Sequence, residues 1–555
     1  MSVTEILPPL VLEDPSQQRW DERCELLVVG FGAAGASTAL EAHAHGINVL
    51  VADRFTGGGA SAKSGGVVYA GGGTRQQQLA GYTDTPEAMF EYLKHETQGV
   101  VSDATLKRFC EQSVANLEWL ESHGAEYDFS VPPHGGKTSY PADGYYLYYS
   151  GNEQVPAYRG EHPPAPRGHR TVAKGQSGRV LYGHLQKACE KAGIRTRLQS
   201  AIKRLVLDNS GRVLGAELWR MPEGSAAAKR HAKLAAKAER LQNFVPAYCD
   251  RLRAEVAALE REHAKPWLVK AEQGVVLSTG GFIFNPALMQ EHGAKYLRNY
   301  KVGATGCDGS AIRLGATIGA ATGQLGQVSA WRFLNPPYCW PKGVVVNKKG
   351  ARFCNEEVYG ATLGAPMCEE HDGDGWLILD KPLRRQALKE TLTGGYWWFQ
   401  TVPALLLMFK AVKGKTLEEL AQKTGMDAAT LSATIARNNA SARGLIEDET
   451  GKSQGNRQVL DQGPFYACDI SAGNQDYPMG GLTLGGLKVD EDTGAVLDTQ
   501  GQMIPGLYAA GRAAVGVASH LYVSGLSLAD CIFSGRRAAQ AVHKAKAQGA
   551  NSTEV

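Results

Sequence analysis

Two hydroxyl-bearing side chains, Tyr522 and Ser524, lie two residues apart near the C-terminal end of the chain and directly precede Gly525. A phenol offers a neutral, directional hydrogen bond that suits a ketone oxygen. A serine hydroxyl can accept a proton if a neighbouring group relays that proton onwards. The pair is therefore a candidate for chemistry on a carbonyl compound. The structural alternative is that Ser524 caps the last helix, because serine is a common N-cap.

A glycine-rich turn near the N-terminus predicts a dinucleotide site. Gly30, Gly32 and Gly35 follow an apolar run, an alanine-rich stretch comes next, and Asp53 ends a second apolar run. This order predicts a strand, a tight turn, a helix and a second strand. Gly30 would allow the turn, Gly32 would admit the pyrophosphate, and Gly35 would allow close helix packing. The phosphates would meet the positive end of the helix, and Asp53 would accept from ribose hydroxyls.

The loop after the second strand favours FAD over NAD. It is small and polar, and its candidate cofactor residues are Ser61, Lys63, Ser64, Gly65 and Gly66. Such a loop can supply backbone donors beside an isoalloxazine ring without crowding it, and NAD dehydrogenases do not need one. The alternative interpretation is a flexible lid loop.

Strand patterns far apart in the sequence indicate one interrupted domain. Short apolar strands precede Thr279 and Gly280, and again Gly511 and Arg512 near the C-terminus. We therefore predict an α/β fold, a split Rossmann-like FAD-binding domain with an inserted α+β capping or catalytic domain. The expected ranges are 21–281 and 463–545 for the FAD-binding domain, 282–462 for the capping domain and 546–555 for a disordered tail. Residues 225–264 are expected to form a helical hairpin, which we interpret as a solvated insertion rather than a partner surface.

Composition excludes several classes of protein. The chain has 555 residues, more than one core usually supports, and its net charge is only +3, without the basic stripe of a nucleic-acid binder. Its ten cysteines occur singly, so neither a zinc nor an iron–sulfur site is expected. The first twenty residues lack a signal-peptide pattern, and the apolar run 402–409 is too short to span a bilayer. We expect a cytoplasmic protein with no metal, no nucleic-acid partner and no transmembrane segment; the oligomeric state is not indicated.

The chain resembles the fumarate reductase/succinate dehydrogenase flavoprotein superfamily. The resemblance rests on motifs that occur in family order, at 30–35, 61–66, 305–309, 347–356, 508–512 and 527–530. It implies an FAD domain, a mobile capping domain and catalysis at their interface. It also implies further FAD contacts from Ala34, Thr279, Gly280, Asp308, Gly511, Arg512, Gly525, Ser527 and Leu528. Some members link the flavin to a histidine in the 61–66 loop; none occurs here, so FAD is expected to bind non-covalently.

One departure from the superfamily pattern concerns the substrate. Fumarate reductase-like members carry an arginine that clamps a substrate carboxylate where this chain has Tyr522, and losing that cation disfavours a dicarboxylate. With segments 140–152 and 359–364, the pair Tyr522 and Ser524 is similar to the 3-ketosteroid dehydrogenase branch, specifically the 3-oxo-5α-steroid Δ4-dehydrogenases. In that branch the tyrosine binds the C3 oxygen, the serine takes the C4 proton and a second tyrosine assists. We assign the second tyrosine to Tyr359, with Tyr338 as the nearest competitor.

The resemblance thus implies an enzyme that introduces the C4–C5 double bond into a 3-oxo-5α-steroid. The C4 hydrogen would leave as a proton to Ser524 and the C5 hydrogen as a hydride to flavin N5, while Tyr522 stabilises the enolate. The electrons would then pass to an acceptor that the sequence does not identify. Alternatives are Δ1-dehydrogenation, reduction of a Δ4 bond, reduction of an unsaturated carboxylate and, from another class, a non-catalytic flavin-binding assembly subunit.

Overall fold

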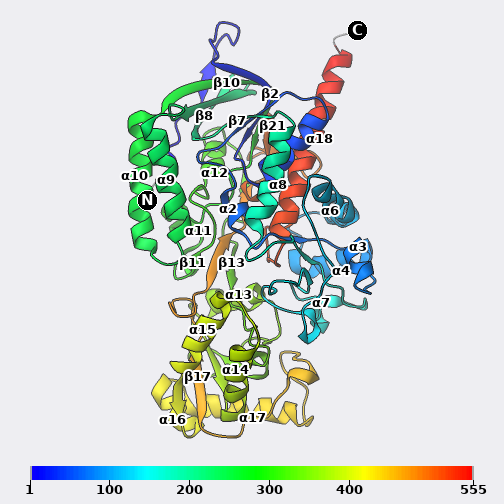
Figure 1. The fold of residues 1–555 in the computed structure, drawn as a ribbon, viewed down its shortest axis with the longest axis vertical. Coiled ribbons are helices and arrows are strands. Elements are labelled where there is room, and N and C mark those ends of the chain that lie inside the picture. The colour runs from blue at the N-terminus through cyan, green and yellow to red at the C-terminus, as the bar shows by residue number, and fades with distance from the viewer. Residues whose placement is uncertain (1–2, 553–555) are drawn as a thin grey trace.

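The computed structural model describes residues 3–552, and a mixed β-sheet forms its centre (Figure 1). Within these residues the sheet has nine strands, with β1-β8-β9-β10-β2-β3-β7 in order, β21 also paired with β10, and β20 with β21. The strands are β1 Leu10–Leu12, β2 Glu22–Val29, β3 Val49–Ala52, β7 Arg195–Arg197, β8 Ser200–Asp208, β9 Val213–Arg220, β10 Lys265–Leu277, β20 Ala495–Leu497 and β21 Met503–Ala509. Apolar side chains cover both faces of the central strands, because helices or loops pack on each side.

The predicted strand–turn–helix–strand unit is present. Strands β2 and β3 pair in parallel, and helix α1 (Ala33–Ala44) connects them. Gly30 makes the turn with φ of +104°, and a Cβ atom there would lie 2.5 Å from the carbonyl oxygen of Ser278. Only glycine fits this conformation and this close approach. Helix α1 packs against the C-terminal helix α18 (Leu526–Ser552).

Segments far apart in the sequence share the central sheet. On one edge of β10, Val276 lies opposite Val28 of β2; on the other edge it lies opposite Tyr508 of β21. The N-terminal and C-terminal segments therefore build one sheet together with β7 to β10, and the chain from about residue 340 to 470 folds below it (Figure 1). The predicted fold class, a split Rossmann-like domain with an inserted α+β part, is confirmed.

The inserted part contains a second sheet, ordered β14-β15-β17-β16. Its strands are β14 Val344–Val346, β15 Trp376–Leu379, β16 Val412–Gly414 and β17 Phe465–Asp469, and its helices are α13 Gly360–Glu370, α14 Lys381–Thr393, α15 Trp398–Phe409, α16 Leu417–Thr424 and α17 Ala428–Ala442.

Two boundaries differ from the prediction. Strand β17 lies beyond residue 462, yet it pairs with β15 and β16 and completes the inserted sheet. Helix α12 (Ser310–Ala316) lies inside 282–462, yet Ala311 and Leu314 pack against the central sheet. Short apolar segments of this kind are compatible with the core of the central sheet and with the core of the inserted part. Their sequence therefore does not reveal which of the two they join.

Smaller elements connect these two parts. They are the strands β4 Val67–Tyr69, β5 Leu147–Tyr148, β6 Gly168–Arg170, β11 Tyr300–Lys301, β12 Thr322–Gly323, β13 Val328–Trp331, β18 Gly480–Thr483 and β19 Gly486–Leu487. The remaining helices are α2 Gly59–Lys63, α3 Arg75–Leu79, α4 Pro86–Thr97, α5 Asp103–Glu111, α6 Ser113–Ser122, α7 Pro156–Arg159, α8 Gly178–Lys191 and α11 Pro286–His292. Strands β4, β6 and β5 form one small sheet, and β11, β18 and β13 form another.

Two further expectations need correction. The hairpin at 225–264 is present as α9 (Ala226–Leu241) and α10 (Pro246–His263), but it is not simply solvated, because α9 lines a cavity of about 720 Å³. The tail predicted as disordered is helical up to Ser552; its last three residues lie outside the described part. Lys546 explains part of this extension, because it forms an ion pair with Glu25 at 2.6 Å. Across residues 3–552, every helix is too short or too polar to cross a bilayer.

A buried charge cluster stabilises the inserted part. Glu356 is 1% exposed and pairs with Arg352 at 2.6 Å and Lys452 at 2.9 Å, and Arg352 also pairs with Asp448 at 2.8 Å. Burial alone would raise the pKa of Glu356, but the two cations outweigh it and lower the pKa. The carboxylate is therefore ionised in the folded protein, and its contribution to stability is lost as the pH falls below the ordinary value of 4.5.

We expect Glu356→Ala to lower the free energy of unfolding by about 3–5 kcal/mol, because it leaves two cations buried without their partner. Denaturant unfolding at pH 7 measures the loss. The exposed neighbour Glu447, replaced by alanine, serves as the control and should change stability by less than about 0.5 kcal/mol. A similar small effect for both variants would contradict this role of Glu356.

Candidate active site

A cavity of about 720 Å³ lies between the central sheet and the inserted part. This volume is within the usual range for small-molecule and cofactor sites. Seventeen of the residues predicted from the sequence line it: Gly30, Gly32, Ala34, Asp53, Ser61, Lys63, Ser64, Gly65, Thr279, Gly280, Tyr359, Arg512, Tyr522, Ser524, Gly525, Ser527 and Leu528. The structure thus brings together segments from both ends of the chain.

Four predicted cofactor residues do not line the cavity but shape its walls. A Cβ atom at Gly35 would lie 1.9 Å from the Gly30 carbonyl oxygen, and one at Gly66 would lie 2.5 Å from backbone of residue 177. At Gly511 a Cβ atom would lie 2.9 Å from the Ala34 side chain. Asp308 is buried and accepts from Arg54 at 3.0 Å. These residues are supports of the site rather than its lining.

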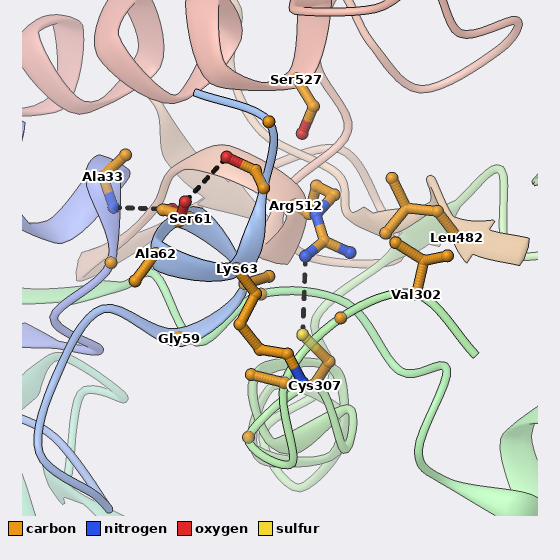
Figure 2. Close-up of a pocket in the computed structure, with 18 of the residues that line it drawn as sticks. Ala33, Gly59, Ser61, Ala62, Lys63, Val302, Cys307, Leu482, Arg512 and Ser527 are labelled. Carbon is orange, nitrogen blue, oxygen red and sulfur yellow. Dashed lines mark hydrogen bonds between the residues drawn. The ribbon is translucent and has the colours of Figure 1, made fainter. Parts of the chain in front are cut away.

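The glycine turn and the 61–66 loop meet at the start of helix α1. The backbone N–H of Ala33 donates to the Ser61 hydroxyl at 3.0 Å, as Figure 2 shows, and Ser64 donates to the Ser61 carbonyl at 2.7 Å. No acidic side chain lies in the first turn of α1. This helix end, with its dipole and without a carboxylate in its first turn, is suited to a phosphate.

Asp53 is also tied to this turn. One carboxylate oxygen accepts from the N–H of Phe31 at 2.8 Å and the other accepts from the N–H of Phe55 at 2.7 Å. Burial raises the pKa of Asp53, although these backbone donors oppose the rise. Each oxygen retains a further acceptor position, so the contact with a ribose stays a prediction.

Positive charge dominates the cavity. Its charged lining consists of two carboxylates, Asp53 and Glu239, and six cations: Arg54, Lys63, Arg179, Arg240, Arg332 and Arg512. Arg512 donates to the Cys307 sulfur at 3.5 Å (Figure 2), while its buried Nη1 atom has no protein partner among the described residues. An anionic group with acceptor oxygens would satisfy this donor and the excess of cations.

Backbone contacts hold the loop that carries Tyr522 and Ser524. The N–H of Ser524 donates to the Ser150 carbonyl at 3.1 Å, and the Ser150 hydroxyl donates back to the Ser524 carbonyl at 3.0 Å. Gly525 follows with φ of +94°, and a Cβ atom there would lie 2.7 Å from the Tyr69 nitrogen. The loop is therefore fixed against the small sheet of β4, β5 and β6 just before α18 begins.

Tyr148 is a residue that the sequence analysis missed. It is 0% exposed, and its phenol donates to the Ser524 hydroxyl at 3.1 Å. A tyrosine cluster of this kind, at 145–149, is more often packing than catalysis, and nothing in its spacing singles out Tyr148. This contact engages the Ser524 side chain away from the start of α18, which disfavours the helix-cap interpretation of Ser524.

Tyr359 lines the cavity, whereas its competitor Tyr338 does not. Tyr359 stands at the start of α13, and its backbone N–H donates to the Asn152 side chain at 2.6 Å. Asn152 in turn donates to the carboxylate of Glu96 at 2.7 Å. Burial raises the pKa of Tyr359 well above its ordinary value, with Tyr522 and Tyr148 adding and the Ser524 hydroxyl opposing. The phenol of Tyr359 is thus close to both members of the predicted pair.

Tyr522 lies in an aromatic wall. Its ring centroid is 5.3 Å from that of Trp331, and Phe333 continues the wall 5.3 Å from Tyr359. Burial raises the pKa of Tyr522 to about 12, so its hydroxyl stays protonated at neutral pH. The arrangement combines a flat apolar surface with one neutral donor, which suits a polycyclic ketone better than a charged compound.

Arg332, which also lines the cavity, is engaged through its two terminal nitrogens, whereas its buried Nε has no partner among the described residues. Arg332 donates to the carbonyls of Tyr477 at 2.8 Å and Ser471 at 3.2 Å. Its guanidinium also lies 4.7 Å from the centre of the Tyr477 ring. Burial lowers its pKa to about 10. These contacts leave Arg332 poorly placed to act as a substitute for the carboxylate clamp that Tyr522 replaces.

Comparison with known proteins identifies the family of this chain. The family described as FAD binding domain matches residues 25–528. The chain belongs to the FAD binding domain family. A 3-oxo-5-alpha-steroid 4-dehydrogenase from Comamonas testosteroni is 49% identical over 513 residues, which cover 89% of this chain and 93% of that protein. A probable fumarate reductase from Shewanella frigidimarina is 26% identical, covering 93% of this chain and 74% of that protein.

One similar solved structure is that of a 3-ketosteroid-delta4-(5alpha)-dehydrogenase from Rhodococcus jostii RHA1, in complex with 4-androstene-3,17-dione. It is 27% identical, superimposes with a TM-score of 0.81, and the match covers 97% of this chain and all of that one. Membership of the FAD binding domain family confirms the superfamily resemblance and the predicted FAD cofactor. The residues of the cavity fit FAD. The start of α1 and the excess of cations suit the two phosphates, and the Nη1 donor of Arg512, which has no partner among the described residues, suits a polar edge of the flavin ring.

Proposed function

We propose that this FAD-dependent oxidoreductase introduces the C4–C5 double bond into a 3-oxo-5α-steroid. The observation that carries the proposal is the cluster of Tyr522, Ser524 and Tyr359 on the cavity wall, with Tyr148 hydrogen-bonded to Ser524. The names of the similar proteins from Comamonas testosteroni and Rhodococcus jostii support the substrate class. Reduction of an unsaturated carboxylate is disfavoured, since Tyr522 offers no charge to a carboxylate.

The chemistry divides between two hydrogens. The hydrogen at C4, next to the ketone, is weakly acidic and leaves as a proton, whereas the hydrogen at C5 must leave with its electron pair. FAD, when bound, supplies the acceptor for that hydride. The two electrons of the C4–H bond become the new double bond, so the oxidised steroid and the reduced cofactor balance.

The side chains of this chain would handle the proton and the oxygen. Tyr522 donates a hydrogen bond to the C3 oxygen, where negative charge develops as C4 loses its proton. Ser524 accepts the C4 proton and passes its own hydroxyl proton to Tyr359, which releases its phenolic proton towards solvent. Serine is a weak base by itself, so this transfer needs a phenol within reach.

Three further properties belong to the proposal. FAD binds non-covalently, because residues 61–66 contain no histidine that could carry a flavin link. The enzyme works in the cytoplasm, a location supported by cysteines that are unpaired throughout the described residues. The inserted part moves relative to the FAD-binding domain, as the superfamily resemblance implies.

Product analysis tests the regiochemistry. The purified enzyme is mixed with a saturated 3-oxo-5α-steroid under anaerobic conditions, and the product is identified by NMR. The expected product is the 4-ene-3-one, with one equivalent formed per FAD. A 1-ene product would replace the proposal with Δ1-dehydrogenation, and an unreduced flavin would support a binding protein without turnover.

Tyr148→Phe tests whether the second phenol assists Ser524. We expect kcat to fall about fivefold with little change in KM, because the variant removes one hydrogen bond worth about 1 kcal/mol from a group that works during catalysis. Steady-state kinetics with a 3-oxo-5α-steroid measures the change. Tyr145→Phe, in the same cluster but away from the cavity lining, is the control and should leave both constants near normal.

A further inference from the structure

The helical hairpin α9–α10 is inserted at a single point in the central sheet. It leaves the end of β9 at Arg220 and returns at the start of β10, where Lys265 lies directly opposite Arg220 in the antiparallel register. The two strands would pair without the hairpin, since a two-residue turn can join such neighbours. The extra helices therefore call for an explanation other than sheet formation.

Helix α9 forms one wall of the cavity. Ala235, Ala236, Glu239 and Arg240 of α9, and Asn243 in the turn that follows it, belong to the cavity lining. In Figure 1 the hairpin runs alongside the central domain towards the inserted part. Its tip reaches that part, because the rings of Phe244 and Trp398 stack with their centroids 6.0 Å apart.

Glu239 connects the hairpin to the loop predicted to contact FAD. Its carboxylate pairs with Lys63 at 2.5 Å and accepts from the backbone N–H of Thr305 at 2.7 Å. Burial would raise the pKa of Glu239, but Lys63 outweighs it and lowers the pKa, so the pair is ionic. Lys63 lies in the same short helix as Ser61, which holds the start of α1. The hairpin thus fixes a cation next to the phosphate end of the site.

Glu260 makes a second connection, at the residues that follow β3. It binds Arg54 through two hydrogen bonds of 2.9 Å and lies 3.1 Å from His231. The His231 ring stacks on Phe55 with centroids 5.9 Å apart. Arg54 and Phe55 both line the cavity directly after Asp53, where a dinucleotide would place its adenosine.

We propose that the α9–α10 hairpin is part of the FAD site, in which Glu239 and Glu260 position Lys63 and Arg54 towards the cofactor. The hairpin would retain a cofactor that has no covalent link to the chain. This inference rests on the FAD cofactor and not on the identity of the steroid. A negative result for FAD binding would therefore leave the proposed steroid reaction untouched, and a negative result for the reaction would leave this inference untouched.

FAD titration of the apoprotein tests the two carboxylates without reference to activity. Glu239→Ala and Glu260→Ala are each expected to raise the Kd for FAD about tenfold, the effect of losing about 1.4 kcal/mol. Glu255→Ala is the matched control, because Glu255 pairs with Arg230 within the hairpin and away from the cavity, and its Kd should not change. An unchanged or lower Kd in the two test variants would overturn the inference, since it would mean that Glu239 merely neutralises Lys63.

Replacing residues 221–264 with Asn-Gly tests the hairpin as a whole. The register of β9 and β10 favours a tight turn at this point, so the shortened chain should keep the circular dichroism spectrum of the apoprotein. We expect its Kd for FAD to rise about a hundredfold and saturating FAD to raise its Tm less than in the full chain. A shortened protein that binds FAD as tightly as the full chain contradicts the inference; if it does not fold, the two point variants decide.

Discussion

Tyr522→Phe is expected to slow flavin reduction by a 3-oxo-5α-steroid by about 10²–10³-fold, the usual effect of removing one aimed oxyanion donor. The variant keeps the ring that packs beside Trp331, so the aromatic wall stays in place. It loses only the hydroxyl that would meet the C3 oxygen. Because this contact strengthens as the enolate forms, we expect kcat to fall far more than KM rises.

Stopped-flow absorbance at the flavin band measures this rate under anaerobic conditions. Tyr338→Phe is the control, because Tyr338 lies outside the cavity lining and packs on His134 and Tyr396. Its rate should match the wild type. Equal rates for wild type and Tyr522→Phe would remove the oxyanion role, and a slow Tyr338→Phe would move the assisting role away from Tyr359. The pKa of about 12 at Tyr522 further predicts no loss of this donor at alkaline pH up to about 10.

Ser524→Ala is expected to slow the same step by about 10²–10⁴-fold, the range of a positioned proton acceptor. The variant removes the acceptor of the C4 proton while the phenols of Tyr148 and Tyr359 remain. Steroid binding should change little, because the apolar wall and Tyr522 are untouched. Flavin reduction and equilibrium steroid binding, followed by spectral shift, separate these two effects.

Ser210→Ala is a suitable control for this variant, since Ser210 lies exposed in the turn between β8 and β9. A Ser524→Ala variant that reduces flavin at the wild-type rate would mean that the proton leaves directly to a phenol. The double variant Ser524→Ala with Tyr148→Phe tests whether Tyr148 acts only through the serine. If it does, the double variant should reduce flavin as slowly as Ser524→Ala alone.

Local patterns were enough to predict the dinucleotide half of the site. The turn at Gly30 needs positive φ and close backbone approach, and such demands leave a glycine signature in the sequence. The pair Tyr522 and Ser524 was predicted from the resemblance, because the two residues replace an arginine and a glycine of the superfamily motif in one short segment. The fold class followed from strands with a buried, apolar character on both faces.

Contacts between distant segments were missed. Tyr148 and Ser524 are 376 residues apart, so their hydrogen bond leaves no mark in either local sequence. The hairpin was interpreted as solvated because its many charges are typical of an exposed helix, yet Glu239 and Glu260 form ion pairs with Lys63 and Arg54, which line the cavity. The tail was predicted as disordered, although Lys546 pairs with Glu25 and the helix continues.

The most direct test of the proposed reaction is single-turnover flavin reduction with a 3-oxo-5α-steroid that carries deuterium at C4 or at C5. We expect deuterium at C5 to slow flavin bleaching with a primary isotope effect, and deuterium at C4 to appear in the solvent while the 4-ene product forms. Both results would follow if Tyr522 holds the ketone and Ser524 takes the adjacent proton. Bleaching without a C5 isotope effect, or a product that retains all its C4 deuterium, would contradict the account.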